Sequence, residues 1–165
     1  YFLNIREEII KDFKFKKVIV NECKSILKQF DSPIGLHIRR GDFLINSANH
    51  YNLSMSYYEN ALDCFDDDRQ VVIFSDDPEW CFEQKLFDND RFLVSQSNSP
   101  YHDLYLMTQC SDFIIANSTY SWWGAWLCMN PCKEVIYPNR WFGKNNAGKS
   151  TIDLFPRSWR VINEN

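Results

Sequence analysis

The sequence predicts an α/β fold in which a Rossmann-like parallel sheet carries helices on both faces. Short apolar runs alternate with helix-like periodic segments, a pattern typical of consecutive βαβ units with right-handed crossovers. The run from Val71 to Phe74 is apolar at every position, as expected for a strand buried on both faces. At 165 residues, the chain is long enough for a single domain with a substantial core.

We expect three parts in this domain: an N-terminal helical segment (1–33), a βα core (34–137) and an aromatic C-terminal tail (138–165). Periodicity and turn residues predict the elements, with Ser54 as a helix N-cap and polar loops over 41–53 and 95–100. The expected helices span residues 4–13, 18–30, 55–65, 78–86, 102–110 and 121–129. The expected strands span residues 34–38, 71–74, 92–94, 112–116 and 134–137, whereas the tail has little periodicity.

Charge and composition argue against several classes of protein. The net charge is −4, with 18 basic and 22 acidic residues mixed along the chain, so no basic field points to nucleic acid. The six cysteines form no CxxC pair, and we expect buried free thiols rather than disulfides or a zinc site. There is no signal peptide or membrane-length apolar run, so we expect a cytoplasmic protein. The start at Tyr1 without an initiating Met indicates a piece of a longer protein.

The expected strand 34–38 ends at two adjacent arginines, Arg39 and Arg40, followed by Gly41 and Asp42. Because an unpaired buried guanidinium is very unfavourable, at least one arginine must face a partner. Arginine offers a rigid fork of donors that matches phosphate or carboxylate oxygens. An ion pair between Asp42 and either arginine is the alternative interpretation.

The segment from Asn117 to Ser121 joins an expected strand to an expected helix. Its hydroxyls, on Ser118, Thr119 and Ser121, and its backbone amides surround a helix N-terminus, which is a ready anion site. Opposite the arginines at the carboxyl edge of the sheet, this segment would complete a diphosphate cradle that needs no metal. Ordinary N-capping is the alternative for each of these residues.

Two further groups of polar residues belong to the same expected edge. Asp76 and Asp77 follow the strand 71–74 and could accept hydrogen bonds from a ribose or a guanine, or could cap the helix that begins at Pro78. His37 lies among apolar neighbours just before the arginines. It is either a satisfied core histidine, a residue that orients the arginines, or a nucleotide contact.

Four segments in this order resemble glycosyltransferase family 11, the bacterial and animal α-1,2-fucosyltransferases. They are HIRRGDF (37–43), FSDDPEWC (74–81), DLYLMTQCSDFIIANSTYSWWGAWL (103–127) and VIYPNRWF (135–142). The resemblance implies an inverting, metal-independent enzyme of GT-B architecture, which transfers L-fucose from GDP-β-L-fucose to the 2-hydroxyl of a terminal galactose. Members of the family are usually about twice this length, so the resemblance implies the donor-binding half, with an N-terminal half missing.

The resemblance also implies residue roles. Arg39, with Arg40, would neutralise the departing diphosphate, His37 and Asp77 would lie near the guanosine, and the segment from Ser118 to Ser121 would lie near the phosphates. Inversion requires a general base, for which Asp42 is the first candidate, although orientation of Arg39 or Arg40 is the more ordinary role for this carboxylate. The family further implies a surface-polysaccharide or O-antigen pathway, with peripheral attachment to the inner face of the membrane.

Two other classes of function remain open from the sequence. One is a catalytically silent module of the same fold that binds a sugar nucleotide or a glycan. The other is an α/β interaction domain in which the arginines are ion-paired and the tryptophans belong to the core, and this class predicts no nucleotide binding.

Overall fold

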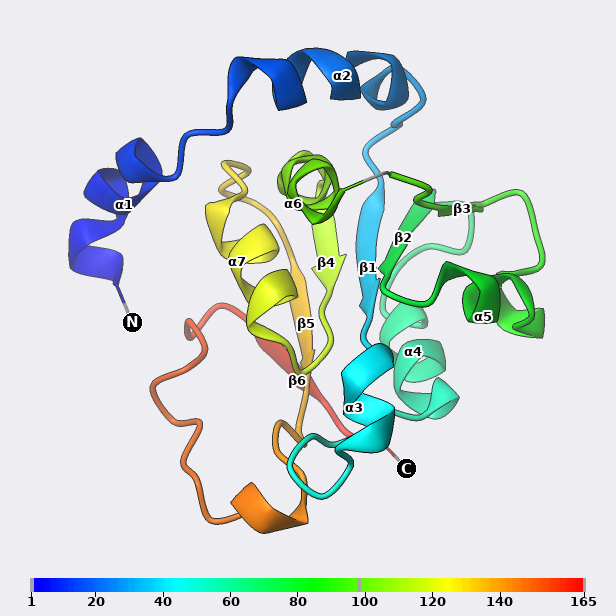
Figure 1. Ribbon diagram of the computed structural model, residues 1–165, viewed down its shortest axis with the longest axis vertical. Coiled ribbons are helices and arrows are strands. Elements are labelled where there is room, and N and C mark those ends of the chain that lie inside the picture. Colours follow the sequence, from blue (N-terminus) through cyan, green and yellow to red (C-terminus); the bar gives the residue numbers. More distant parts are fainter. Residues whose placement is uncertain (1, 98, 165) are drawn as a thin grey trace.

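The computed structural model describes residues 2–97 and 99–164. Tyr1 and Asn165, the ends of the expected domain, and Asn98 in the expected polar loop lie outside the described residues. The chain forms a six-stranded sheet of order β3-β2-β1-β4-β5-β6 in which all neighbours pair in parallel (Figure 1). This arrangement confirms the predicted α/β, Rossmann-like fold class.

Strand order places a topological switch at the middle of the sheet. From β1 the chain moves outward to β2 and β3, then returns to the other side of β1 with β4 and continues to β5 and β6. In sheets of this kind, ligands bind beyond the carboxyl ends of the strands at such a switch point. The strands are β1 (Ile34–Ile38), β2 (Val71–Ser75), β3 (Phe92–Val94), β4 (Asp112–Ile114), β5 (Val135–Pro138) and β6 (Arg160–Ile162).

Helices connect the strands and lie on both faces of the sheet, with α6 and α7 side by side in Figure 1. The α-helices are α1 (Arg6–Asp12), α2 (Lys17–Leu27), α3 (Gly41–Ile45), α4 (Met55–Leu62), α5 (Pro78–Phe82), α6 (Pro100–Thr108) and α7 (Thr119–Leu127). Short 3₁₀ helices are η1 (Leu3–Ile5), η2 (Lys85–Phe87) and η3 (Lys144–Asn146). Within the described ranges, none of these helices is both long and apolar enough to cross a membrane.

Alternation of side chains along the strands divides the core between the two faces of the sheet. On β2, Val72 and Phe74 pack with α2, α6, α7 and the C-terminal tail, whereas Val71 and Ile73 pack with α4 and α5. Successive residues of a strand point to opposite faces, and both faces are covered by helices, so the whole run is apolar. Cys23, Cys81, Cys110 and Cys128 are buried as free thiols.

The structure differs from the sequence-based expectation in several places. The expected helix 78–86 ends at Phe82 in α5 and is followed by the 3₁₀ helix η2, and other boundaries shift by a few residues. The tail adds β6 at the edge of the sheet, so the expected core of residues 34–137 leaves out one strand; this strand has only three residues and a partly exposed Val161, and so gives little pattern. The expected loop 41–53 begins with α3, whose five residues bury only Phe43. Ser54 stands at the N-cap of α4, but its hydroxyl bonds the side chains of Glu164 and Ser56 rather than a backbone N–H of the helix.

Candidate functional site

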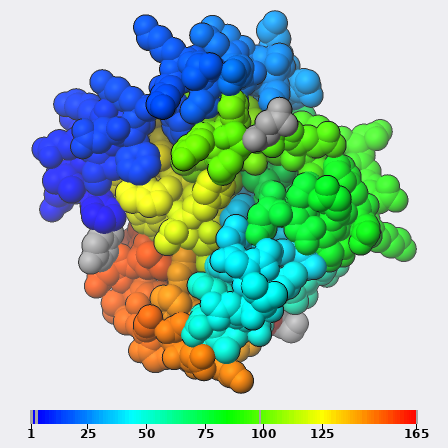
Figure 2. All heavy atoms as spheres, in the orientation of Figure 1, coloured from blue at the N-terminus to red at the C-terminus, as the bar shows by residue number. Residues whose placement is uncertain are grey.

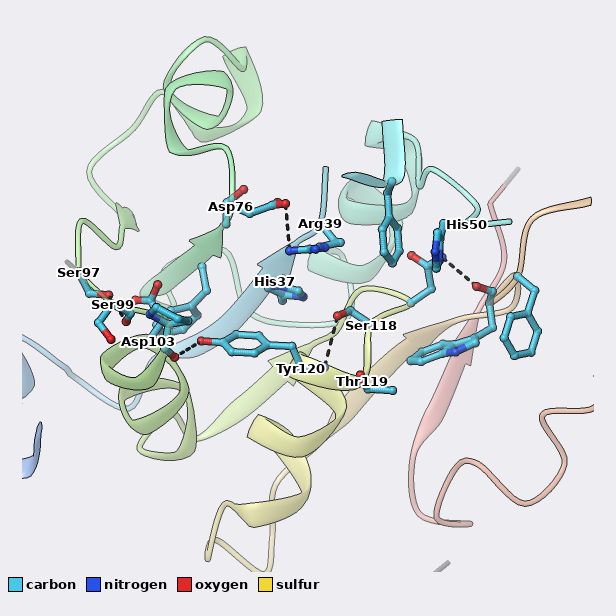
Figure 3. A pocket seen from close by; sticks show the side chains of 17 residues that line it. His37, Arg39, His50, Asp76, Ser97, Ser99, Asp103, Ser118, Thr119 and Tyr120 are labelled. Carbon is cyan, nitrogen blue, oxygen red and sulfur yellow. Dashed lines mark hydrogen bonds and ion pairs between the residues drawn. The ribbon is translucent and has the colours of Figure 1, made fainter. Parts of the chain in front are cut away.

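A pocket of about 740 Å³ lies at the carboxyl ends of β1 to β5, around the switch point. Figure 2 shows a hollow on this face, bordered by the cyan segment of α3, the green segment of α6 and the yellow segment of α7. Figure 3 shows the side chains that converge on the pocket. The lining residues are His37, Arg39, Phe43, His50, Phe74, Ser75, Asp76, Ser97, Ser99, Pro100, Asp103, Asn117, Ser118, Thr119, Tyr120, Trp141 and Phe142.

Arg39 lies at the middle of this pocket, where β1 ends. Its guanidinium is held by two carboxylates, at 2.5 Å from Asp42 and 3.0 Å from Asp76, and lies 5.3 Å from the centre of the Phe43 ring. Gly41 allows this arrangement, because a Cβ at that position would come within 2.4 Å of Asp76 Oδ2. A cation that is already positioned in this way is prepared to bind an anion with little reorganisation.

Arg40 points away from the pocket. Its Nε donates to Asp77 Oδ2 at 3.0 Å, and its guanidinium lies 3.8 Å from the ring centre of Trp80. Asp77 also caps α5 by accepting a hydrogen bond from the backbone N–H of Trp80. Adjacent residues at a strand end face opposite sides, so only one of the two arginines can reach the pocket.

The N-terminus of α7 forms the facing wall. Ser118 caps the helix by accepting from the N–H of Tyr120, and Ser118, Thr119 and Tyr120 all line the pocket. Ser121 does not line it: this side chain is fully buried and its hydroxyl donates to the carbonyls of Ala116 and Ser118. The N-terminus of α7, which carries the partial positive charge of the helix dipole, and the side chain of Thr119 therefore face the pocket.

His37 forms part of the floor and carries no charge at neutral pH. Burial, assisted by the nearby charge of Arg39, lowers the pKa of its imidazole from 6.5 to about 3. Its Nδ1 atom is buried and has no hydrogen-bond partner among the described residues. A polar atom left unpaired beside a pocket is available to a ligand that fills it.

Asp103, in the first turn of α6, supplies a carboxylate at the far end of the pocket. Burial raises the pKa of this carboxyl. Hydrogen bonds from Ser95 and Ser97 and the nearby charge of His102 lower it, but burial has the larger effect. Ser95 Oγ lies 2.5 Å from Asp103 Oδ1. Ser97 and Ser99 line the same end, so the pocket offers a group of hydrogen-bonding side chains there.

Aromatic rings form the opposite end. The rings of Phe43 and His50 stack with centroids 4.1 Å apart, and Trp141 and Phe142 follow β5. Asn117 joins the two segments that carry them, because its Nδ2 donates to the carbonyls of Tyr51 at 2.8 Å and Trp141 at 2.9 Å. The predicted donor-site residue Asn117 thus supports the pocket wall through its side-chain amide.

The structure brings six of the predicted site residues to the pocket: His37, Arg39, Asp76, Asn117, Ser118 and Thr119. Arg40, Asp42, Asp77 and Ser121 do not line it. Sequence reasoning missed Phe43, His50, Asp103, Trp141 and Phe142 as site residues, although the expected polar loop 95–100 marked the strand end next to Asp103. Among the described residues, no group of three or more His, Cys, Asp and Glu side chains is arranged to hold a metal ion.

Comparisons with known proteins find relatives along almost the whole chain. The O-antigen biosynthesis glycosyltransferase WbnK of Escherichia coli is 36% identical over 162 residues, which cover 90% of this chain and 54% of that protein. The α-1,2-colitosyltransferase of Escherichia coli is 29% identical over a match that covers 96% of this chain and 58% of that protein. The human galactoside α-(1,2)-fucosyltransferase 1 is 29% identical, over 77% of this chain and 40% of that protein.

The chain therefore spans about half the length of the curated bacterial relatives that it matches. The model of glycosyl transferase family 11 matches residues 1–163. The quoted motifs and the pocket at the switch point fall within this match. By this match, the chain belongs to glycosyltransferase family 11.

Proposed function

We propose that this chain is the donor-binding half of an inverting, metal-independent transferase, which moves L-fucose from GDP-β-L-fucose to the 2-hydroxyl of a terminal galactose. The observation that carries the proposal is Arg39, held by two carboxylates in the middle of the pocket and opposite the N-terminus of α7. The relatives' names support the reaction class, since they specify α-1,2 transfer of fucosyl and colitosyl groups.

In this proposal the diphosphate lies between Arg39 and the first turn of α7. When the bond from the sugar C1 to the phosphate oxygen breaks, negative charge develops on the β-phosphate. A fixed guanidinium and backbone N–H groups stabilise that charge, which is the task that a divalent cation performs in other transferases. The side chains of Ser118 and Thr119 adjoin this position.

The nucleoside occupies the end of the pocket formed by Ser97, Ser99 and Asp103. A guanine presents two N–H groups on its Watson–Crick edge, and the carboxylate of Asp103 is an acceptor for them. The neutral imidazole of His37 lies beneath the junction of nucleoside and diphosphate, with its unpaired Nδ1 available to the ligand. A partly buried carboxylate at this place favours a base that presents two N–H groups over bases that lack them.

The complete protein would use a second domain for the acceptor, in the GT-B manner, because its relatives are about twice as long. We further propose that it acts in surface-polysaccharide assembly in the cytoplasm, attached peripherally to the inner face of the membrane. The name of the relative WbnK, an O-antigen biosynthesis glycosyltransferase, supports the polysaccharide part of this proposal.

Titration of GDP in the presence of EDTA tests the site. We expect GDP to bind without metal, and Arg39→Ala to weaken binding by about 10- to 100-fold, since charge-assisted hydrogen bonds contribute about 1.5–3 kcal/mol. Arg157→Ala is the matched control, because Arg157 is exposed on the tail and outside the pocket. No GDP binding by the wild type would contradict the proposal, and binding without transfer to a galactoside by the complete protein would indicate a silent binding module.

Gly41→Ala tests the support of Arg39 without removing any polar group. The new methyl group would overlap Asp76 Oδ2 and displace the carboxylate that orients the guanidinium. We expect GDP to bind about tenfold more weakly, because the guanidinium loses the carboxylate that orients it and charge-assisted hydrogen bonds contribute about 1.5–3 kcal/mol. Gly148→Ala is the control, since a Cβ there has nothing within 4 Å; equal effects of the two substitutions in the titration would refute the role of Asp76.

A further inference from the structure

The pocket has two chemically different ends, with Arg39 between them. Asp103, Ser97 and Ser99 lie at one end and His50 at the other, as Figure 3 shows. A diphosphate held at Arg39 joins the nucleoside to the sugar, so a nucleoside at the Asp103 end places the sugar C1 toward His50. The rings around His50 offer apolar surface to the carbon face of a hexose.

His50 is fixed in place by its backbone and by its ring. The backbone N–H of His50 donates to the carbonyl of Asn46 at 3.0 Å, and the residue forms an isolated antiparallel bridge with Phe142. The neighbouring Tyr51 carbonyl accepts from Asn117 Nδ2. The imidazole stacks on Phe43 with an interplanar angle of 17°, and Phe43 itself is buried. This side chain is therefore held against the pocket with little freedom to rearrange.

The other acidic and basic side chains that line the described pocket are unsuited to take a proton at this end. Asp76 is paired with Arg39, and Asp103 lies at the nucleoside end. His37 is buried, and its lowered pKa leaves the imidazole neutral. Asp42, the first candidate from the sequence, is 58% exposed, binds Arg39 and does not line the pocket.

The described charged groups around His50 are three cations and two carboxylates. Of the carboxylates, Asp42 is paired with Arg39, and Glu164 is hydrogen-bonded to the Tyr51 side chain. Arg39 lies against the ring of Phe43, Arg140 lies 4.0 Å from the ring centre of Tyr51, and Lys149 lies 5.7 Å from that of Phe142. Among the described residues, no carboxylate pairs with the His50 imidazole, so its ring nitrogens remain available to a ligand.

We propose that His50 is the general base of the reaction, a role that rests on the proposed function. Its ring nitrogen accepts the proton of the acceptor hydroxyl as the acceptor oxygen forms a bond to C1 of the fucose. The C1–O bond to the β-phosphate breaks on the opposite side, and its electron pair leaves with GDP at Arg39. The imidazolium then gives its proton to solvent, so the products are the inverted glycoside, GDP and one proton.

The test compares His50→Gln and His50→Phe with the wild type in the complete protein, by GDP titration and by a fucosyl-transfer assay between about pH 5 and pH 8. His50→Phe preserves a ring that can stack on Phe43 but cannot accept a proton. We expect both variants to bind GDP as the wild type does, while kcat falls by about 100-fold or more. The rise of kcat with pH in the wild type should be absent from both variants.

Two controls separate this role from a structural one. His102→Gln removes a histidine that is bonded to Glu22 outside the pocket, and it should leave kcat unchanged. Asp42→Asn should retain the rise of kcat with pH. The assignment is overturned if the His50 variants keep wild-type kcat or its pH dependence, or if both lose GDP binding. A wild type that does not bind GDP overturns the proposed function itself, and this assignment with it.

Discussion

The protein is expected to lose about 2 kcal/mol of its unfolding free energy through His37 alone when the pH falls from 7 to 5. The imidazole has a pKa of about 3 in the folded chain and 6.5 when exposed. Between these values the unfolded state binds a proton that the folded state does not, so stability decreases as the pH falls through this window. The full shift corresponds to roughly 5 kcal/mol, a limit that is reached only below pH 3.

Urea unfolding of the wild type and His37→Gln at pH 7 and pH 5 measures this contribution. Glutamine does not titrate. Between pH 7 and pH 5, the unfolding free energy of His37→Gln should therefore fall by about 2 kcal/mol less than that of the wild type. Asp103 acts in the opposite direction, because its raised pKa means that the folded state holds a proton more tightly, but this effect is common to both proteins. Equal pH dependence of the two proteins would show that His37 is not buried as a neutral group.

The strands of the sheet could be predicted from the sequence because those beside the switch point are covered on both faces. Continuous apolar runs such as Val71 to Phe74 can be recognised without knowledge of their partners. The parallel arrangement then places the strand ends together, which predicted that Arg39, Asp76 and Ser118 would converge. The three-residue edge strand β6 has no such pattern, because it is partly exposed and pairs on one side only.

The direction of individual side chains could not be predicted in the same way. Arg39 and Arg40 are equivalent in sequence pattern, yet Arg39 faces the pocket while Arg40 lies on Trp80. Asp103 reads as an ordinary acid in the first turn of a helix, and only its burial beside Ser95 makes it a site residue. His50 lies in a segment without periodicity, and the bridge to Phe142, distant in sequence, brings it to the pocket.

Trp122→Ala is expected to reduce the unfolding free energy by about 3–5 kcal/mol, as truncation of a large buried aromatic residue does. Trp122 is 4% exposed, lies in α7 against Trp126 and Trp159, and donates its indole N–H to the carbonyl of Leu154 at 2.8 Å. Its removal therefore leaves a cavity and an unpaired carbonyl beneath the tail. Urea unfolding, monitored by circular dichroism, measures the loss.

The adjacent Trp123 provides the matched control on the same helix. It is only partly buried and stacks on Phe13 of the N-terminal segment, with centroids 4.9 Å apart. Trp123→Ala should consequently reduce the unfolding free energy by less than Trp122→Ala does. Trp122→Phe should retain part of the packing and reduce the unfolding free energy by about 1–3 kcal/mol, chiefly because the Leu154 carbonyl loses its partner. A larger loss in Trp123→Ala would contradict this order. Because the tail held by Trp122 follows directly from Trp141 and Phe142, the same interaction also supports the aromatic wall of the pocket.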